Sequence, residues 1–347
     1  MKYIGLDVHK HNIAACVVND DGEPVKSIEI GSRKDLHKIP EYMEGQDYCV
    51  MMESSTYVYD VYRYFCESGT ETYVAHAKAL RMITTSDKKT DRNDAELLGR
   101  YLRLWKKGEI ELSMAYIPSK EECELRDICR LKEEVSGKIG DEVRRIKSHM
   151  FRNTEPFPDG NDRLAVNKVR AAVTKSYPED AALQSRMRYL EDLRKQNSEL
   201  TRLIESQLPG DRNVELLCTI PGIARQTAVQ IMSMIIDIER FEDPEKMCSY
   251  FGLVPRVRDS GGKEHHGRMT KSGDKMMRAI MERVTLSHII HCDSSIKEFH
   301  RRKASETGTK KALISASRKM LAMIHSILRT KKPFEARVPV PKEQGTV

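Results

Sequence analysis

No segment of the sequence approaches the roughly 18 consecutive uncharged apolar residues that a membrane helix needs. The first residues also lack the charged and apolar regions of a signal peptide, and they predict a strand instead. These two absences predict a protein without a membrane partner. We therefore expect it to be soluble and cytoplasmic.

Paired cysteine motifs are absent as well. The eight cysteines show no CxxC spacing, and most of them lie in apolar runs. The histidines show no HxxxH or Cys/His spacing of the zinc type, so none of them is a candidate ligand. The pattern favours reduced core thiols over disulfides or structural zinc.

The chain has 347 residues with 39% hydrophobic content, which is enough for two or three packed cores. We expect an α/β part followed by an all-α part. Residues 1–118 alternate strands with helices, and residues 119–207 predict a long helical or coiled-coil arm. Residues 208–347 predict a helical domain with a loop at Ser260 and a basic tail.

Five strand signals occur in the first part, and three of them form a meander before the helix-linked strands begin. This order is typical of a mixed sheet of the ribonuclease H-like or RuvC-like type. In that architecture carboxylates gather at the ends of the first and fourth strands and on a later helix. The expected strands are Tyr3–Leu6, Ile13–Val18, Val25–Ile30, Tyr48–Met52 and Glu71–Ala75.

Four acidic residues occur at those places. Asp7 and Glu53 end two strand candidates, and the segment KTDRNDA puts Asp91 and Asp94 on one face of a helix's first turn. Each residue alone has an ordinary structural explanation, such as a turn cap or a helix-dipole interaction. Four neighbouring carboxylates repel one another unless a cation or protonation relieves the charge, and their oxygens suit Mg²⁺ or Mn²⁺. The set therefore predicts a divalent metal site.

The middle part predicts two long helices separated by a Pro/Gly-rich break. Apolar residues recur at helical spacing in the first helix, and the second carries Asn197 among heptad leucines. A lone asparagine at a core heptad position fixes the pairing register. Two arrangements fit this pattern: a hairpin within one chain, and a coil between subunits.

The last part begins with LLCTIPGIARQTAVQ, which resembles a helix-hairpin-helix. The Pro-Gly turn of that motif offers backbone N–H groups to a phosphate. Ala224 stands where the hairpin usually has its second glycine. A tight turn between two packed helices explains the segment equally well.

A basic segment, GLVPRVRDSGGKEHHGRMTKSGDKMMR, surrounds Ser260. Two glycines follow the serine and leave a permissive backbone that a phosphodiester can approach, although Ser-Gly-Gly is also an ordinary loop. A serine nucleophile needs cationic groups to balance the charge that develops on phosphorus. The basic excess, which recurs between Lys297 and Lys332, favours polyanion contact over a solvated surface. The candidate nucleic-acid-binding residues are Arg256, Arg258, Lys263, Arg268, Lys271, Lys275 and Arg278.

Taken together and in order, IGLDVHK, the Glu53 strand end, KTDRNDA, IPGI and GLVPRVRDSGGKEHHGRMTKSGDK resemble the bacterial insertion sequence one-ten family of transposases. The resemblance extends over nearly the whole chain. It implies a RuvC-like DEDD nuclease domain that a coiled-coil arm joins to a serine-bearing transposase domain. It makes Asp7, Glu53, Asp91 and Asp94 the metal-binding, catalytic tetrad, and Ser260 the nucleophile.

The resemblance also implies the partners. Members of the family recombine donor and target DNA, directed by a structured non-coding (bridge) RNA, and combine the acidic domain of one subunit with the serine domain of another. We therefore expect Mg²⁺ (or Mn²⁺), DNA, a guide RNA, a homodimer that assembles into a tetramer, and a location at the bacterial nucleoid. Two alternatives stay open: a Holliday-junction resolvase-like metal nuclease that uses water, and a non-catalytic nucleic-acid-binding protein.

Overall fold

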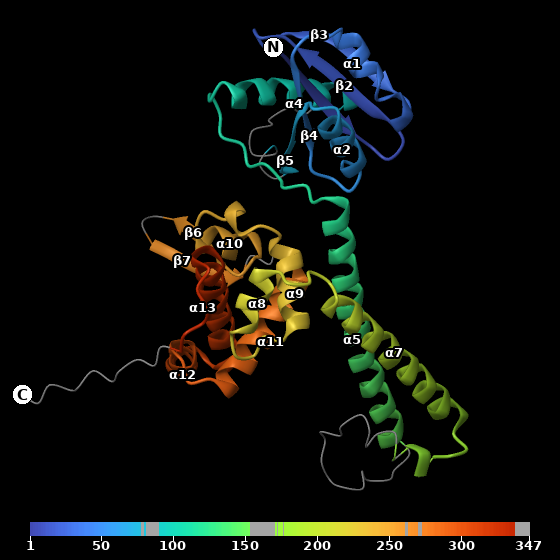
Figure 1. The fold of residues 1–347 in the computed structure, drawn as a ribbon, viewed down its shortest axis with the longest axis vertical. Coiled ribbons are helices and arrows are strands. Elements are labelled where there is room, and N and C mark those ends of the chain that lie inside the picture. Colours follow the sequence, from blue (N-terminus) through green and yellow to red (C-terminus); the bar gives the residue numbers. More distant parts are fainter. Residues whose placement is uncertain are drawn as a thin grey trace, which may run out of the picture. The chain divides into compact units, whose positions relative to one another are not determined.

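The computed structural model describes residues 1–77, 80, 90–152, 171, 173–175, 177–260, 263–269 and 273–336. The chain divides into two compact units, Met1–Ser119 and Lys120–Val347 (Figure 1). Each unit has its own buried apolar clusters. Among the described helices, none is both long and apolar enough to cross a membrane.

Five strands form one mixed sheet in the first unit, and all five predicted strands are present. The order across the sheet is β3-β2-β1-β4-β5. The β1, β2 and β3 strands pair antiparallel, whereas β4 is parallel to both β1 and β5. The strands are β1 (Lys2–Val8), β2 (Ile13–Val18), β3 (Pro24–Ile30), β4 (Tyr48–Glu53) and β5 (Glu71–Ala75).

Different helices cover the two faces of this sheet. Even-numbered β1 residues such as Leu6 pack in one cluster with α1 and α2, whereas Tyr3 packs in a second cluster with α4. Because side chains alternate along a strand, Asp7 belongs to the face that α4 covers. The helices of this unit are η1 (Arg33–Asp35), α1 (Lys38–Met43), α2 (Tyr59–Glu67) and α4 (Asp91–Lys106).

Helix α4 lies in direct backbone contact with β1. A Cβ atom at Gly5 would lie 2.0 Å from the Ala95 carbonyl oxygen and 2.4 Å from the Gly99 nitrogen, so glycine is required there. The Thr90 side chain caps the helix by accepting a backbone hydrogen bond. The cap fixes Asp91 as the first helical residue, and the close approach of α4 brings that residue to the end of β1.

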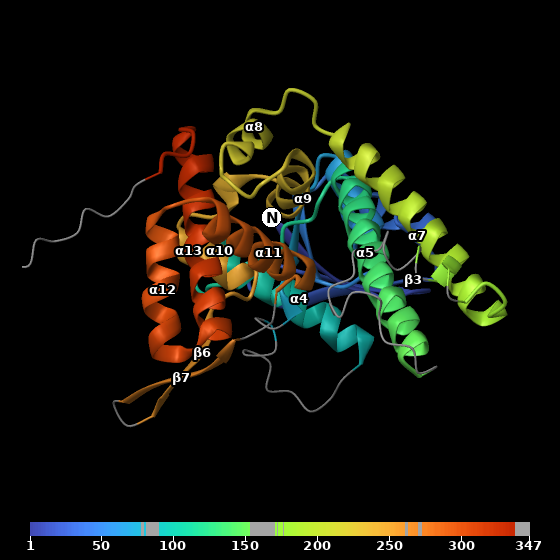
Figure 2. The ribbon, with the colours of Figure 1, turned by 90° about the horizontal axis from the view of Figure 1, so that it is seen from below.

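Two long helices pack against each other in the second unit (Figure 1, Figure 2). The Ser136 hydroxyl donates a 2.8 Å hydrogen bond to Asn197 Oδ1, so the heptad asparagine has its partner within the chain. These contacts favour the hairpin within one chain over a coil between subunits. The helices are α5 (Lys120–Arg152) and α7 (Ala181–Glu205).

The rest of the second unit is built around a helical core. Helices α9, α11 and α13 each bury a set of apolar residues in one cluster, and α12 packs beside α13. The elements are α8 (Arg212–Cys218), α9 (Arg225–Ile235), η2 (Ile238–Arg240), α10 (Pro244–Tyr250), α11 (Lys275–His291), α12 (Ser295–Thr307) and α13 (Thr309–Thr330).

A two-stranded hairpin interrupts this region, which the sequence analysis expects to be helical apart from a loop. Strands β6 (Pro255–Ser260) and β7 (Lys263–Met269) pair antiparallel (Figure 2). Ser260 is paired with Lys263, so its backbone ends a strand and does not lie in an open loop. The expectation of a loop was therefore wrong, and a Gly-Gly pair between two extended runs was the overlooked hairpin signal.

The Pro-Gly turn joins α8 to α9 and packs on α11. Gly222 has a φ of 98°, and a Cβ atom there would lie 2.9 Å from the His288 backbone nitrogen. The Pro221 carbonyl accepts a 2.9 Å hydrogen bond from His288 Nδ1. These contacts favour a tight turn between packed helices over a phosphate clamp.

Candidate metal centre and nucleic-acid interface

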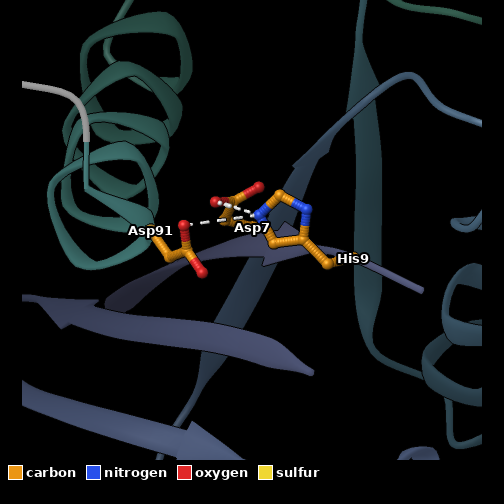
Figure 3. A group of neighbouring side chains, drawn as sticks. All are labelled: Asp7, His9 and Asp91. Atoms are coloured by element: carbon orange, nitrogen blue, oxygen red, sulfur yellow. Dashed lines mark hydrogen bonds and ion pairs between the residues drawn. The ribbon is translucent and has the colours of Figure 1, made fainter. Parts of the chain in front are cut away.

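Three side chains meet where the end of β1, the β1–β2 turn and the start of α4 come together (Figure 3). His9 Nε2 lies 3.0 Å from Asp7 Oδ2 and 3.6 Å from Asp91 Oδ1. One ligand atom from each residue lies within 4.8 Å of the other two. Asn12 Nδ2 donates a 3.3 Å hydrogen bond to the second Asp91 oxygen. Two of the four predicted carboxylates therefore lie on either side of one imidazole.

The other two predicted carboxylates, Glu53 and Asp94, lie near this group in the fold. The β1–β4 register pairs Leu6 with Met52, so the next residues along the two strands, Asp7 and Glu53, are neighbours. Asp94 lies in the first turn of α4. In the described part of the chain, however, neither Glu53 nor Asp94 joins the group of ligand atoms within 4.8 Å.

The Asp7 carboxylate is in an electrostatically unfavourable place. Its side chain is 17% exposed, and burial is the largest cause that raises its pKa. The charges of Asp91 and Asp94 raise the pKa further, whereas His9 lowers it. A cation bound beside Asp7 would compensate for both the burial and the repulsion.

The donor set fits a divalent cation. Carboxylate oxygens are the preferred ligands of Mg²⁺ and Mn²⁺, and an imidazole nitrogen is a common ligand of first-row transition ions. The two distances from His9 Nε2, 3.0 Å to Asp7 Oδ2 and 3.6 Å to Asp91 Oδ1, fall in the range spanned by groups that share one ion, since bonds of about 2.1 Å place ligand atoms about 3.0 to 4.2 Å apart.

The β1–β2 turn contributes two side chains to the site that the sequence did not predict there. His9 and Asn12 have no metal-type spacing of their own, and both reach Asp91 only because the turn folds toward α4. The available signal was position alone, because His9 stands two residues after the strand-ending Asp7. The turn that follows a strand end can carry further side chains into a site at that end.

The predicted nucleic-acid-binding residues lie on the hairpin and on α11. The exposed Lys275 begins α11, and Lys271 lies outside the described residues. The Arg278 guanidinium donates to the carbonyls of Phe251 (3.3 Å) and Gly273 (2.6 Å), so it holds the segment before α11 in place. The hairpin contributes the backbones of Arg256, Arg258, Lys263 and Arg268.

A five-stranded mixed sheet with carboxylates at the ends of β1 and β4 and at the start of a covering helix is consistent with a domain of the DEDD type. Comparison with known families agrees. A model described as a transposase, for the DEDD domain of IS110 elements, matches residues 4–153, and a second, described as "Transposase IS116/IS110/IS902 family", matches residues 214–301. The chain belongs to the IS110 family of transposases.

Individual relatives extend the likeness over most of the chain. The pilin gene-inverting protein of Moraxella lacunata is 26% identical over 267 residues, which cover 76% of this chain and 72% of that protein. The transposase for insertion sequence element IS1111A of Coxiella burnetii is 19% identical over 347 residues, covering 96% and 91%. The protein is thus a DNA transposase or recombinase of an insertion sequence, and its DEDD-type domain suggests the use of a divalent metal.

Proposed function

We propose that this transposase cleaves and rejoins DNA at a site where Asp7, Glu53, Asp91 and Asp94 hold Mg²⁺, with Ser260 as the nucleophile and a structured non-coding RNA as the guide. The observation that carries the proposal is the meeting of Asp7 and Asp91 at the end of the central strand, with Glu53 beside Asp7 in register. A bound cation would relieve the repulsion within an acidic cluster of this kind.

The chain's own residues supply the framework for phosphoryl transfer. Asn12 fixes the orientation of the Asp91 carboxylate, and the burial of Asp7 reduces competition from water. A bound divalent cation would neutralise charge on the phosphoryl oxygens and lower the pKa of a coordinated hydroxyl group.

The proposed covalent step exchanges one phosphate ester bond for another. Ser260 Oγ attacks the phosphorus and forms a phosphoserine ester, while one bridging P–O bond breaks and releases a deoxyribose hydroxyl. The serine proton is lost to a base or to solvent, and the leaving oxygen takes up a proton. Attack by the new hydroxyl of a second strand reverses the step and rejoins the DNA.

Basic surfaces of the second unit supply the phosphate contacts in this proposal. The hairpin β6–β7 carries four of the predicted arginines and lysines. Lys310 and Lys311 are exposed in the first turn of α13, which contains no acidic residue and has no side-chain cap. Lysines at a helix N-terminus interact unfavourably with the helix dipole, so these two lysines do not stabilise α13. Their position favours a role in binding an anion.

Two substitutions test the catalytic proposal separately. We expect Asp7→Ala to abolish strand cleavage while leaving DNA binding within about twofold, because phosphate contacts carry the affinity. We expect Ser260→Ala to remove a covalent protein–DNA adduct that denaturing gels detect in the wild type. Asp21→Asn, an exposed substitution in the β2–β3 turn, is the matched control and should cleave normally.

The same assays separate the alternatives. Cleavage that leaves free ends and persists in Ser260→Ala would support a metal nuclease that uses water, whereas no cleavage in Mg²⁺ buffer would support a non-catalytic binding protein. Guidance is tested by purifying the chain from cells and sequencing the bound RNA. A single discrete transcript supports a guide, and a mixture of ribosomal fragments contradicts it.

A further inference from the structure

The turn between β1 and β2 presents two polar side chains to the acidic pair. His9 Nε2 lies between Asp7 and Asp91, at 3.0 and 3.6 Å from their nearest oxygens, and Asn12 donates to the remaining Asp91 oxygen (Figure 3). The turn is closed by a 3.0 Å hydrogen bond from the His9 backbone N–H to the Asn12 carbonyl. Both side chains are therefore carried by one short, closed turn.

Arg33 holds this turn from a distant part of the sequence. Its guanidinium donates to the carbonyls of Lys10 (2.7 Å) and His9 (3.3 Å) and also to the Tyr57 carbonyl (3.1 Å). Asp60 forms an ion pair with the same guanidinium. The backbone that carries His9 is thus fixed to the segment that follows β4, where Glu53 lies, and the imidazole is not on a free loop.

Stability does not account for this arrangement. The side chains of His9 and Asp91 are 47% and 53% exposed, and exposed ion pairs contribute only about 0 to 1 kcal/mol. The ligand atoms, in contrast, have the spacing expected around a cation. Bonds of about 2.1 Å place adjacent ligand atoms about 3.0 Å apart and opposite ones about 4.2 Å apart, and both His9 distances fall in that interval.

We propose that His9 Nε2 is a direct ligand of the divalent cation bound by Asp7 and Asp91, so that the centre has mixed nitrogen and oxygen donors. Asn12 is the positioning residue for Asp91, and Arg33 is the positioning residue for His9. A nitrogen donor favours Mn²⁺ over Mg²⁺ relative to an all-carboxylate site. This inference rests on the proposed metal site.

Pulsed electron paramagnetic resonance on the full chain with Mn²⁺ alone tests the ligand directly. A coordinated imidazole nitrogen gives ¹⁴N couplings to the Mn²⁺ electron spin. We expect these couplings in the wild type and their loss in His9→Gln, together with a rise of about tenfold or more in the Kd for Mn²⁺ and a smaller rise for Mg²⁺. His11→Gln, an exposed change in the same turn, is the matched control and should retain the couplings.

The outcomes separate this inference from the proposal on which it rests. Bound Mn²⁺ without ¹⁴N couplings, or couplings that persist in His9→Gln, would overturn His9 as a ligand while leaving the carboxylate site intact. Failure of the wild type to bind Mn²⁺, or equal binding by Asp7→Asn, would instead remove the metal site itself. Because His9 is half-exposed, His9→Gln is expected to unfold at the wild-type temperature, and circular dichroism checks this.

Discussion

At the scale of single residues, Asp7 shows how a functional position can oppose stability. Its carboxylate is largely buried, and burial together with Asp91 and Asp94 raises its pKa. Ionisation of Asp7 therefore costs more in the fold than in water when no cation is bound beside it. Carboxylates in places where ionisation is unfavourable are typical of active sites.

Asp7→Asn should therefore stabilise the fold in the absence of metal and abolish its stabilisation by metal. We expect Asp7→Asn to raise the Tm of the first unit in EDTA by roughly 2 to 5 °C, because it removes a charge from a repulsive, desolvated place. Mn²⁺ should raise the Tm of the wild type, since a ligand at 100 times its Kd stabilises by about 2.7 kcal/mol. Mn²⁺ should leave the Tm of Asp7→Asn unchanged. Differential scanning calorimetry with EDTA or Mn²⁺ measures both, and a lower Tm for Asp7→Asn in EDTA would contradict the argument.

His288 of α11 is a fully buried titratable residue that packs on the Pro-Gly turn. Its Nδ1 donates to the Pro221 carbonyl and its Nε2 lies 2.9 Å from the Ser294 hydroxyl oxygen, while Phe334 packs edge-on against the ring. Burial lowers the pKa of His288, and the bond to Pro221 opposes this only in part. The neutral ring is therefore the form that fits the fold.

We predict that acidification destabilises the second unit through this residue. Between the lowered folded pKa and the ordinary value of about 6.5, the unfolded chain binds more protons than the folded one, so stability falls as the pH falls through that interval. His288→Gln should flatten the slope by on the order of 1 kcal/mol between pH 7.5 and 5.5. Urea denaturation at a series of pH values measures it. The exposed His291→Gln on the same helix is the control, and an unchanged slope in His288→Gln would refute the assignment.

At the scale of elements, the distance between α4 and β1 determines whether Asp91 reaches Asp7. Gly5 and Gly99 permit the two backbones to touch, and a Cβ atom at Gly99 would lie 2.8 Å from Val18 Cγ2. The clash at Gly5 would be with backbone atoms of α4, so rotating a side chain cannot relieve it. The pair of glycines thus positions the metal centre without contacting it.

Gly5→Ala should therefore damage both the fold and the site. The new methyl group would overlap backbone atoms of α4, and we expect a loss on the order of 3 kcal/mol in the free energy of unfolding, with weaker Mn²⁺ binding. Gly31→Ala is the control, because a Cβ atom there meets no described atom within 4 Å. Urea denaturation and Mn²⁺ titration measure the two effects. A wild-type Mn²⁺ affinity in a folded Gly5→Ala would show that the helix position does not matter.

The elements differ in how far the sequence predicts them. The five strands and the start of α4 are predictable because short apolar runs and the acidic KTDRNDA segment are local signals. The β6–β7 hairpin was missed because, within the described residues, its two strands pair with each other alone and carry many charges, so no apolar alternation marks them. The sequence did not decide between a hairpin of α5 and α7 and a coil between subunits. The contact that favours the hairpin, Ser136–Asn197, joins positions 61 residues apart.

At the scale of the whole molecule, the site is only partly predictable, because some of its contacts join residues that are far apart in the sequence. Sheet topology places the ends of β1 and β4 side by side, so the neighbouring positions of Asp7 and Glu53 follow from strand order. The place of His9 does not, because it depends on Arg33, which lies 24 residues away, and on the start of α4. The metal-binding and catalytic roles of these residues stay predictions.

The division of the chain into two units also bears on catalysis. All four proposed metal-binding carboxylates lie in Met1–Ser119, and Ser260 lies in Lys120–Val347. The second unit is held together by contacts between the arm and the helical core, such as those from Arg126 to the carbonyls of Ser233 and Met234. Neither unit alone carries both halves of the proposed chemistry.

Mixing two inactive variants tests whether the halves come from different subunits. Asp7→Ala retains Ser260 and Ser260→Ala retains the carboxylates, so an equimolar mixture should regain roughly a quarter of the wild-type adduct if subunits pair at random and each site is shared between two chains. A mixture of Asp7→Ala with Asp94→Asn, which lacks intact carboxylates in every chain, should stay inactive. If each site were formed within one chain, no mixture would regain activity, because no single chain carries both an intact acidic cluster and the serine. Denaturing gels that detect protein-linked DNA measure the outcome.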